Sequence, residues 1–455
     1  MRMYLLYSFL TALGMLIAAP YFLVTGLRRG QTLSSLRQRF GWSYPPELSS
    51  SASRSIWIHA VSVGEVLAVV PLARRLKERF PAQRLVVSTT TATGQRLARE
   101  RLPFAESVFY FPLDWRGPAR RALRAAHPEL IVIAETEIWP NFLREARREG
   151  VPVAFVNGRL SDRSFRGFAR AHALTLGFLR SFLRRILANA TIYLMQSEAD
   201  ADRLRDLGAP EERVVVAGNL KYDLGQPHES DLSRWLGGEL LRSQRGPLIV
   251  AGSVLEGEEP PVLEAMSVIE AQWPAAMLAL APRKPDRFDA CAMEIQKTGR
   301  TVVRRSGLSL DETSSPALGE PRSVFLLDSV GELGSLFGLA DAVFIGGSLV
   351  HGGGHNILEP AVAGRVPIFG PSMENFKDVA ARFLEAGAGV QVSNAEELAA
   401  AWQLLLLDPL RREQMGEAAR NLVERYRGAT QRVLEYLVSL LNSHDELAAT
   451  ARGGS

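Results

Sequence analysis

Residues 56–66 read Ile-Trp-Ile-His-Ala-Val-Ser-Val-Gly-Glu-Val, and they show the pattern on which the whole chain is built. An apolar run that ends near Ala60 predicts a buried strand, and the amphipathic stretch Val66–Phe80 predicts a helix. Gly64 allows the backbone to turn tightly between the two. A strand, a tight turn and a helix make up the repeating unit of an α/β fold with a parallel sheet.

The same alternation continues along the chain and then restarts after a polar stretch at Leu224–Gly246, which we interpret as a linker. Further strands are predicted at Leu85–Ser88, Leu130–Ala134, Val153–Val156, Ile192–Met195 and Val214–Ala217, and after the linker at Leu248–Ala251, Met277–Ala281, Thr301–Val303, Val324–Leu327, Ala342–Ile345 and Val366–Phe369. This rhythm predicts two Rossmann-like, doubly wound α/β domains. Because ligands bind beyond the carboxyl ends of parallel strands, we also expect an interdomain cleft.

The predicted boundaries give four parts. Residues 1–30 form an N-terminal membrane anchor, 31–230 an N-terminal Rossmann-like domain, 231–430 a C-terminal Rossmann-like domain, and 431–455 a C-terminal helix and tail.

Composition and charge narrow the class of protein. The chain has 455 residues, of which 47% are hydrophobic, and this is enough for sizeable cores. Its one cysteine, Cys291, excludes an internal disulfide framework and a Cys-rich zinc site. Residues 1–200 carry 28 Lys and Arg against 14 Asp and Glu, whereas residues 201–455 carry 25 against 35. The first half therefore suits an anionic partner: nucleic acid, an anionic membrane or a phosphorylated substrate.

The N-terminus contains a long uncharged segment. Met3–Leu27 has no charged side chain, and Arg28 and Arg29 follow it directly. About 20 apolar residues span a bilayer as a helix, and the positive charge after the segment favours a chain that stays in the cytoplasm. A cleaved signal peptide is disfavoured, because Arg-Arg stands where small residues should be. The segment predicts a retained anchor at the cytoplasmic face of a membrane; Pro20 leaves an interfacial or re-entrant helix open.

Several enzyme classes are excluded by motifs that are missing or misplaced. The sequence has no G-x-x-x-x-G-K-[ST], and no G-x-G-x-x-G follows a first strand, which disfavours P-loop NTPases and dinucleotide oxidoreductases. The esterase-like segments at 60–64 and 351–354 occur in the wrong order for a serine hydrolase. His351 and His355 are separated by three glycines, so they do not share a helix face, and we predict no metal site.

Three polar segments of the first half follow predicted strands. Glu65 lies in a first helical turn, where it either complements the helix dipole or acts as a general base. Glu135 and Glu137 follow the strand Leu130–Ala134 and, at a spacing of two residues, point to one side, as cleft carboxylates or as a turn cluster. Lys221, in Gly-Asn-Leu-Lys, either meets an anion or is solvated.

The second half contains the segments that suit a nucleotide. Ser253 ends one strand, and Arg283 follows another, where a planar guanidinium can clamp an anion. Gly346, Gly347 and Ser348 open a glycine-rich loop that either exposes backbone N–H groups to phosphate or only makes tight turns. Beyond the loop, Asn356 and Glu359 open a helix and are candidates to bind ribose or base.

A basic segment lies between Arg159 and Arg185, with seven arginines and one acid. Four of the arginines recur at three- and four-residue spacing and form one helical face: Arg159, Arg163, Arg166 and Arg170. This face is either solvated or in contact with anionic lipid headgroups. Nucleic acid is disfavoured, because no segment resembles a known nucleic-acid-binding module.

Taken together, these motifs resemble the 3-deoxy-D-manno-octulosonic acid (Kdo) transferase family of lipopolysaccharide synthesis. The matching segments extend from the N-terminal anchor to about residue 430: His59–Val66, Ser88–Gly94, Glu135–Asn141, Asn157–Ser161, Gln196–Asp200, Gly218–Asp223, Ala281–Arg283 and Gly346–Pro360. The chain departs from the family at Val254, where Thr is frequent, and at His351. Both departures concern fine contacts to the donor.

The resemblance implies a GT-B fold and an inverting transfer of Kdo from CMP-Kdo to a lipid A precursor at the cytoplasmic face of the bacterial inner membrane, with no metal and no cofactor. By this resemblance Glu65 is the general base and Lys221 is essential. Glu135 is favoured as a second essential acid, although Glu137 remains open. The family's CMP contacts correspond to Arg283, the Gly346–Ser348 loop, Asn356 and Glu359. The number of Kdo residues transferred is not fixed by these motifs.

Two other functions compete with this hypothesis. A membrane-associated GT-B transferase that uses a UDP-sugar would be stabilised by UDP rather than by CMP. A nucleotide-binding scaffold would bind CMP without releasing it from donor and acceptor.

Overall fold

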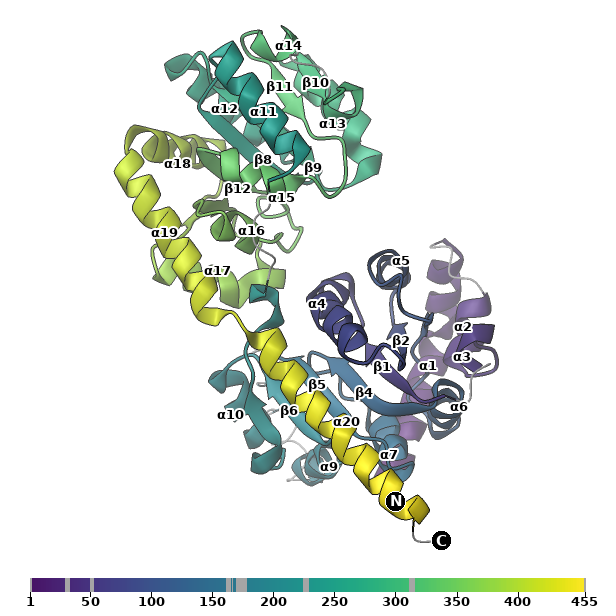
Figure 1. Cartoon of the computed structure of the whole chain (residues 1–455). Coiled ribbons are helices and arrows are strands. Elements are labelled where there is room, and N and C mark those ends of the chain that lie inside the picture. The colour runs from purple at the N-terminus through teal and green to yellow at the C-terminus, as the bar shows by residue number, and fades with distance from the viewer. Residues whose placement is uncertain are drawn as a thin grey trace. The chain divides into compact units, whose positions relative to one another are not determined.

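The computed structural model describes residues 2–28, 33–49, 53–160, 165, 167–168, 178–223, 229–310 and 316–453 (Figure 1). The chain divides into two compact units. The first comprises Met1–Asp223 and Arg427–Ser455, and the second comprises Leu224–Tyr426.

The first unit is built on a parallel sheet of seven strands, in the order β3-β2-β1-β4-β5-β6-β7. The strands are β1 (Ser55–His59), β2 (Arg84–Thr89), β3 (Ser107–Tyr110), β4 (Pro128–Ala134), β5 (Val153–Gly158), β6 (Ile192–Met195) and β7 (Val214–Val216). The helices are α1 (Arg2–Arg28), α2 (Leu33–Arg39), α3 (Pro46–Ser49), α4 (Val63–Arg79), α5 (Ala92–Arg101), α6 (Arg116–Ala126), α7 (Pro140–Arg148), α9 (Phe178–Leu187), α10 (Glu198–Asp206) and α20 (Ala429–Gly453).

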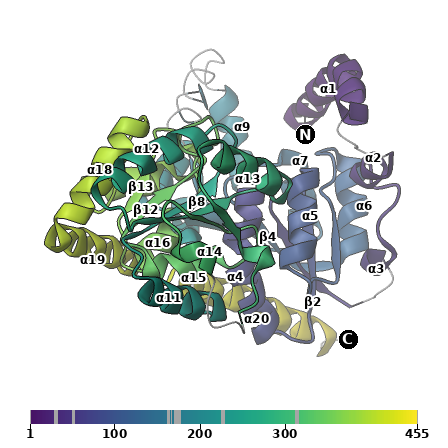
Figure 2. The same ribbon diagram turned by 90° about the horizontal axis from the view of Figure 1, so that it is seen from above.

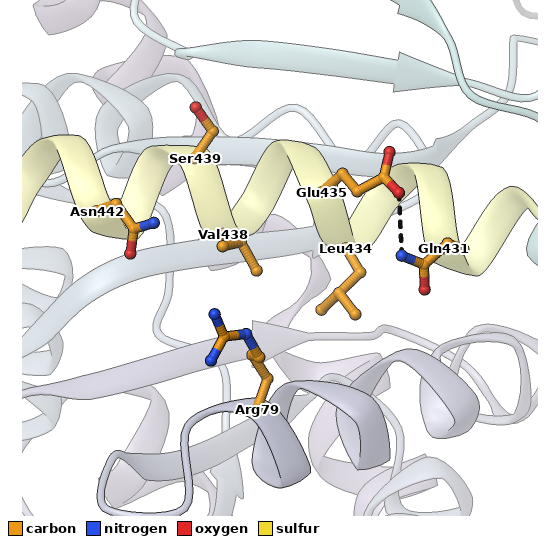
Figure 3. Close-up of a pocket in the computed structure, with 7 residues that line it drawn as sticks. All are labelled: Arg79, Gln431, Leu434, Glu435, Val438, Ser439 and Asn442. Atoms are coloured by element: carbon orange, nitrogen blue, oxygen red, sulfur yellow. Dashed lines mark hydrogen bonds between the residues drawn. The ribbon is translucent and has the colours of Figure 1, made fainter.

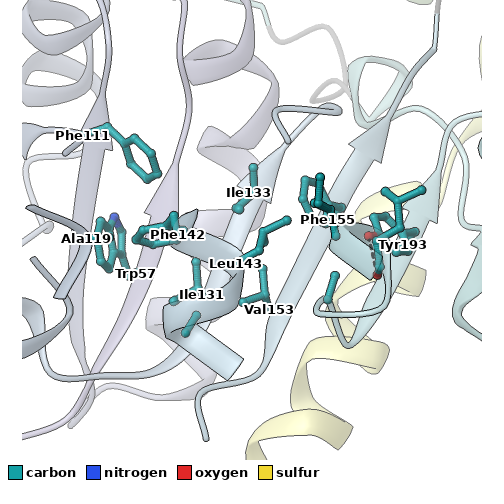
Figure 4. Close-up of a cluster of buried hydrophobic side chains, with 14 of the residues drawn as sticks. Trp57, Phe111, Ala119, Ile131, Ile133, Phe142, Leu143, Val153, Phe155 and Tyr193 are labelled. Carbon is teal, nitrogen blue, oxygen red and sulfur yellow. Dashed lines mark hydrogen bonds between the residues drawn. The ribbon is translucent and has the colours of Figure 1, made fainter. Parts of the chain in front are cut away.

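Both faces of this sheet are covered by helices, because its central strands are apolar on both sides. Trp57 of β1 packs with Ile131 of β4 and Phe142 of α7 in one buried cluster (Figure 4). The neighbouring residues Ile56 and Ile58 point to the opposite face, where they pack with residues of α4, α5 and α20. This alternation is the side-chain period of a strand.

The terminal helix α20 belongs to the first unit, although the sequence suggested a separate C-terminal part. In Figure 1 it runs along the sheet of this unit, and it contacts α4 and β4. Val433 and Leu437 are fully buried in the cluster behind the sheet. Asp223 accepts hydrogen bonds from the N–H groups of Gly428 (2.6 Å) and Thr430 and so holds the start of the helix.

The second unit has its own parallel sheet of seven strands, in the order β10-β11-β9-β8-β12-β13-β14. The strands are β8 (Leu248–Val254), β9 (Met277–Pro282), β10 (Val302–Arg304), β11 (Val324–Leu326), β12 (Ala342–Ile345), β13 (Pro367–Phe369) and β14 (Val390–Gln391). The helices are α11 (Asp231–Ser243), α12 (Glu259–Gln272), α13 (Phe288–Lys297), α14 (Pro316–Gly319), α15 (Leu333–Leu336), α16 (Leu358–Val362), α17 (Lys377–Glu385), α18 (Ala395–Leu407) and α19 (Pro409–Tyr426). Figure 2 shows α12 and α18 on one side of this sheet, and α11 and α15 on the other.

The predicted two-sheet architecture is confirmed, and each of the twelve predicted strands is present. The sequence missed β3 and β14, which are short strands at sheet edges. The interpretation of Leu224–Gly246 as an irregular linker was wrong over Asp231–Ser243, which is helix α11. Ser230 caps this helix, and its buried residues Leu232, Trp235 and Leu236 have helical spacing, which the glycine pair that follows obscures in the sequence.

The membrane anchor predicted at residues 1–30 is not confirmed. Helix α1 covers most of this segment. Across the part of the chain that the structure describes, no helix combines the length and the apolar character that crossing a bilayer requires.

Candidate active site

Two predicted catalytic residues of the first unit, Glu65 and Glu135, lie where the strand order of its sheet reverses, whereas Lys221 follows the edge strand β7. The chain lays β2 and β3 on one side of β1 and then places β4 on the other side. Glu65 follows β1 and Glu135 follows β4, and these two strands are hydrogen-bonded neighbours in which His59 pairs with Ile133. Ligands of open α/β sheets bind at this kind of switch point, beyond the carboxyl ends of the strands.

Glu65 lies at the start of α4 and folds back over the helix N-terminus. The N–H of Val61 donates to Oε2 (2.8 Å), and the hydroxyl of Ser62 donates to Oε1 (2.8 Å). Ser62 in return accepts from the N–H of Glu65 (3.4 Å) as the N-cap. Both interpretations of Glu65 therefore have support, since its side chain helps to cap α4 and also stands at the switch point.

The electrostatic surroundings of Glu65 distinguish it from an ordinary capping carboxylate. Glu65 is only 6% exposed, and its pKa is raised to about 7, mainly because of this burial. The negative charges of Glu135 and Glu137 contribute to the raised value, whereas the hydrogen bonds from Val61 and Ser62 oppose it. Among the described residues, no Lys or Arg forms an ion pair with Glu65. A carboxylate with a pKa near neutrality can accept a proton at physiological pH.

The Glu135–Glu137 segment is held in a strained turn. Glu135 has φ of 54°, a left-handed conformation that non-glycine residues rarely adopt, and its N–H donates to Val156 O (2.8 Å). Thr136 Oγ1 accepts from the N–H of Arg159 (2.9 Å) and donates to its carbonyl (2.5 Å). Burial, with a smaller contribution from Glu135, raises the pKa of Glu137. Both acids contribute to the charge around Glu65, and the essential role favoured for Glu135 stays a prediction.

Lys221 lies in a 3₁₀ turn, η2 (Leu220–Tyr222). A network of hydrogen-bonded side-chain amides holds this turn in place. Asn157 Oδ1 accepts from the N–H of Leu220 (2.9 Å), and Asn219 Oδ1 accepts from the N–H of Lys221 (3.0 Å). Gln196 joins the two, since its amide donates to Asn157 O (2.9 Å) and accepts from Asn219 (2.9 Å). No role was predicted for Asn157, Gln196 and Asn219, because their contacts connect three loops that are distant in the sequence.

The second unit repeats the arrangement at its own switch point. Strands β8 and β12 are neighbours, and Ile345 pairs with Gly252. Ser253 at the end of β8 has φ of 57°, and the N–H of Gly346 donates to Gly252 O (2.8 Å). A Cβ on Gly346 would lie 2.7 Å from Ser253 O, so the glycine loop lies tightly against the end of β8. Arg283 follows β9, the neighbour of β8 on the other side.

The backbone donors of the glycine loop are already occupied. The N–H groups of Gly347, Ser348 and Leu349 all donate to the carboxylate of Glu258, at 2.6, 2.9 and 2.8 Å. The hydroxyl of Ser348 is also buried, since it donates to Ile345 O (2.5 Å) and accepts from Gly370 N (2.8 Å). The expected exposure of these N–H groups to phosphate is therefore absent, because Glu258 accepts from them instead. A donor-binding role of the loop stays a prediction.

Asn356 and Glu359 lie together, as their spacing suggested. The amide of Asn356 donates to Glu359 Oε1 (3.1 Å), and its oxygen accepts from the N–H of Leu358 (3.1 Å). Arg283 is exposed and close enough to His355 to contribute to the lowering of that residue's pKa to about 4, for which burial is the larger cause. His355 is thus neutral at physiological pH, and Arg283 presents its positive charge to solvent.

The sequence was compared with known proteins. A family model described as 3-deoxy-D-manno-octulosonic-acid transferase matches residues 34–224. The 3-deoxy-D-manno-octulosonic acid transferase of Haemophilus influenzae is 33% identical over 88% of this chain and 90% of its own length. The chain belongs to the Kdo transferase family. The Bordetella pertussis transferase is 36% identical over 84% of this chain and 86% of its own.

A solved structure supports the fold of this Kdo transferase family member. The S. aureus MnaA–UDP co-structure matches with a TM-score of 0.52 at 14% identity, and the match covers 86% of this chain and 97% of that chain. At this identity the likeness concerns the fold alone.

Two features lie away from the residues described above. Arg159 is half-buried beside Thr136, and the other three arginines of the predicted basic face, Arg163, Arg166 and Arg170, lie outside the described residues. An open groove of about 490 Å³ is lined by Arg79, the last residue of α4, and by α20 residues such as Leu434 and Glu435 (Figure 3). Because Glu65 is in the first turn of the same helix, this groove is not the candidate site.

Proposed function

We propose that this Kdo transferase family member is an inverting, metal-independent glycosyltransferase that moves Kdo from CMP-Kdo to a lipid A precursor, with Glu65 as its general base. The observation that carries the proposal is the carboxylate of Glu65: it stands at the switch point of the first sheet and has a pKa near 7. The family motifs and the relatives of the same name support the class of sugar.

Inversion requires one base, which removes the proton from the acceptor hydroxyl while that oxygen attacks the anomeric carbon from the side opposite the leaving CMP. Glu65 accepts this proton, and its oxygens are held in place by Val61 and Ser62. A base works best when its pKa lies near the working pH, which burial provides here. Glu135 and Glu137 assist by favouring protonation of Glu65.

The departing CMP gains negative charge on its phosphate as the bond to the sugar breaks. Arg283 is an exposed cation after β9, next to the switch point of the second sheet, and it stabilises that charge without a metal. Lys221, fixed by the amides of Asn157 and Asn219, is assigned to the carboxylate of Kdo. Deprotonation and contact with the Kdo carboxylate are thus tasks of the first unit, and binding of the CMP part of the donor is a task of the second.

The decisive experiment incubates the purified chain with CMP-Kdo and a tetra-acylated lipid A precursor and analyses the lipid by mass spectrometry. The proposal predicts a product heavier by one or more Kdo residues, and no product with UDP-sugars. Thermal shift measurements should show stabilisation by CMP and not by UDP. Stabilisation by UDP alone would favour the competing UDP-sugar transferase, and CMP binding without lipid product would favour the scaffold.

The proposal includes association with the cytoplasmic face of the inner membrane, for which helix α1 is the main argument. Its polar side chains face the protein: Asn189 donates to Tyr4 Oη (3.1 Å), Asn141 to Ser8 Oγ (3.0 Å) and Trp115 to Thr11 Oγ1 (3.1 Å). Its large apolar side chains point outward, in particular Leu16 (72% exposed) and Ile17 (73%). A soluble surface helix has the reverse polarity, so the outer face of α1 suits lipid.

The acceptor is itself a lipid, so a membrane-bound enzyme meets it in two dimensions. Sedimentation with anionic vesicles tests this part. The wild-type chain should co-sediment, and Leu16→Ser combined with Ile17→Ser should reduce the bound fraction several-fold. Exchange of Leu241 of α11, which is 82% exposed, for Ser is the matched control and should leave binding unchanged. Equal binding by all three proteins would contradict the role of α1.

A further inference from the structure

Glu258 is an acidic residue in a fully buried position. It precedes α12, its residue is 0% exposed, and the described structure gives it no ion-pair partner. A buried carboxylate without a partner is costly, so its surroundings must compensate for the lost water. Four backbone N–H groups do so: Leu255 and Gly347 donate to Oε2 (2.8 and 2.6 Å), and Ser348 and Leu349 donate to Oε1 (2.9 and 2.8 Å).

From these contacts we propose that Glu258 is the positioning residue that fixes the glycine loop and thereby sets the affinity for the CMP part of the donor. The inference rests on the proposed function, because that function makes the loop part of the donor site. Three successive N–H groups that converge on one point form a concave anion site. Here the anion is supplied by the protein itself, from a segment about ninety residues earlier in the chain.

Close packing makes this arrangement rigid. A Cβ on Gly346 would lie 2.7 Å from Glu258 Oε2 and 2.7 Å from the backbone of Val254. Only glycine therefore allows the loop to pack this closely against the carboxyl group. Because Glu258 is fully buried, a ligand phosphate cannot take its place without opening the loop. The loop therefore contributes shape to the donor site, and the positive charge comes from residues such as Arg283.

The adjacent residue provides a matched control. Glu259 is 1% exposed, but it accepts from Gly257 N (2.9 Å) and pairs with Arg287 (2.9 Å), and within the described structure it forms no hydrogen bond with the glycine loop. Glu258→Gln and Glu259→Gln therefore replace one buried carboxyl group each at neighbouring positions. In Glu258→Gln, one oxygen that accepts two N–H groups becomes an NH₂ that cannot accept either. A merely structural role predicts similar damage in both variants.

Hydrogen exchange tests the loop without any ligand. Amides 347–349 should be protected in the wild-type chain, and they should exchange at least tenfold faster in Glu258→Gln than in Glu259→Gln. Fast exchange of these amides in the wild-type chain, or the same rates in both variants, would overturn the proposal.

Calorimetric titration with CMP tests whether Glu258 sets the affinity for the CMP part of the donor. Glu258→Gln should bind CMP at least about tenfold more weakly than the wild-type chain, as expected when buried donors lose an acceptor, and Glu259→Gln should stay within twofold. Wild-type affinity in Glu258→Gln would refute the effect on the donor. Absence of CMP binding by the wild-type chain would instead refute the proposed function, and the exchange rates would still decide whether Glu258 fixes the loop.

Discussion

Two glutamates occupy corresponding positions, each after the first strand of one unit, but they have different surroundings. Glu65 follows Gly64 after β1, and Glu258 follows Gly257 after β8. Glu65 is buried beside two acidic neighbours, and these effects raise its pKa to about 7 against the opposing effect of its two hydrogen-bond donors. Glu258 has four backbone donors, which hydrogen-bond to both of its carboxyl oxygens. The same residue type thus suits proton transfer in one unit and loop positioning in the other.

The raised pKa of Glu65 predicts a pH-dependent stability cost. Between its unfolded value near 4.5 and its folded value of about 7, the folded chain holds the proton more tightly, so the stability of the protein falls as pH rises through this window. Glu65→Gln removes the effect. Urea denaturation should show the variant to be more stable than the wild-type chain by up to about 3 kcal/mol at pH 8, and by under about 1 kcal/mol at pH 5. A difference independent of pH would contradict the shift.

The position of Glu65 could be predicted from the sequence, whereas its acidity could not. The strand, Gly64 and the helix start are local signals. The burial of its carboxyl group and the proximity of Glu135 depend on the pairing of β1 with β4, which lie about seventy residues apart. Glu258 was missed for the same reason, although the recurrence of Gly-Glu after the first strand of each unit was a usable signal.

At the scale of elements, the turn that carries Lys221 depends on Asn157. This residue has φ of 55°, and its Oδ1 accepts from Leu220 N. Asn157→Ala should cost about 1–3 kcal/mol, because it loses the acceptor and adds strain in a conformation that alanine disfavours. Asn157→Gly, which tolerates the positive φ, should cost less. Both variants should lower kcat more than tenfold and leave CMP affinity within twofold. An unchanged kcat in both variants would show that Asn157 does not position Lys221 for the reaction.

Helix α20 supplies a second prediction at this scale. Leu437 is fully buried against the first sheet, so Leu437→Ala should reduce the free energy of unfolding by about 2–5 kcal/mol. Leu410 of α19 is 65% exposed, and Leu410→Ala should change it by less than about 0.5 kcal/mol. Denaturant unfolding, followed by tryptophan fluorescence, compares the two. Equal effects would mean that α20 does not help to hold the first unit together.

The elements that the sequence predicted well are those with long apolar runs. Central strands such as β4 are buried on both faces and read as continuous Leu, Ile and Val. The edge strand β14 has only two residues and little apolar signal, and α11 has a glycine pair in its middle that lowers helix propensity. Tertiary packing forms these elements, and a local pattern does not reveal packing.

At the scale of the whole molecule, positive charge is concentrated in the first part of the chain and negative charge in the second. This division matches the two tasks proposed for them. The first 200 residues have a net charge of +14, and the remainder has −10. The proposed acceptor bears phosphates and lies in an anionic membrane, which suits a basic first unit carrying the outward apolar face of α1. The donor needs only local positive groups, so the second unit can be acidic overall.

The central claim is that Glu65 removes the proton from the acceptor. It is tested most directly by measuring lipid product and CMP affinity side by side in the wild-type chain and in Glu65→Gln. The hydrogen bond from Val61 can persist in this variant, but the base is gone. We predict that kcat falls at least about a thousandfold while CMP affinity stays within twofold. Product formation within tenfold of the wild-type rate would contradict the account.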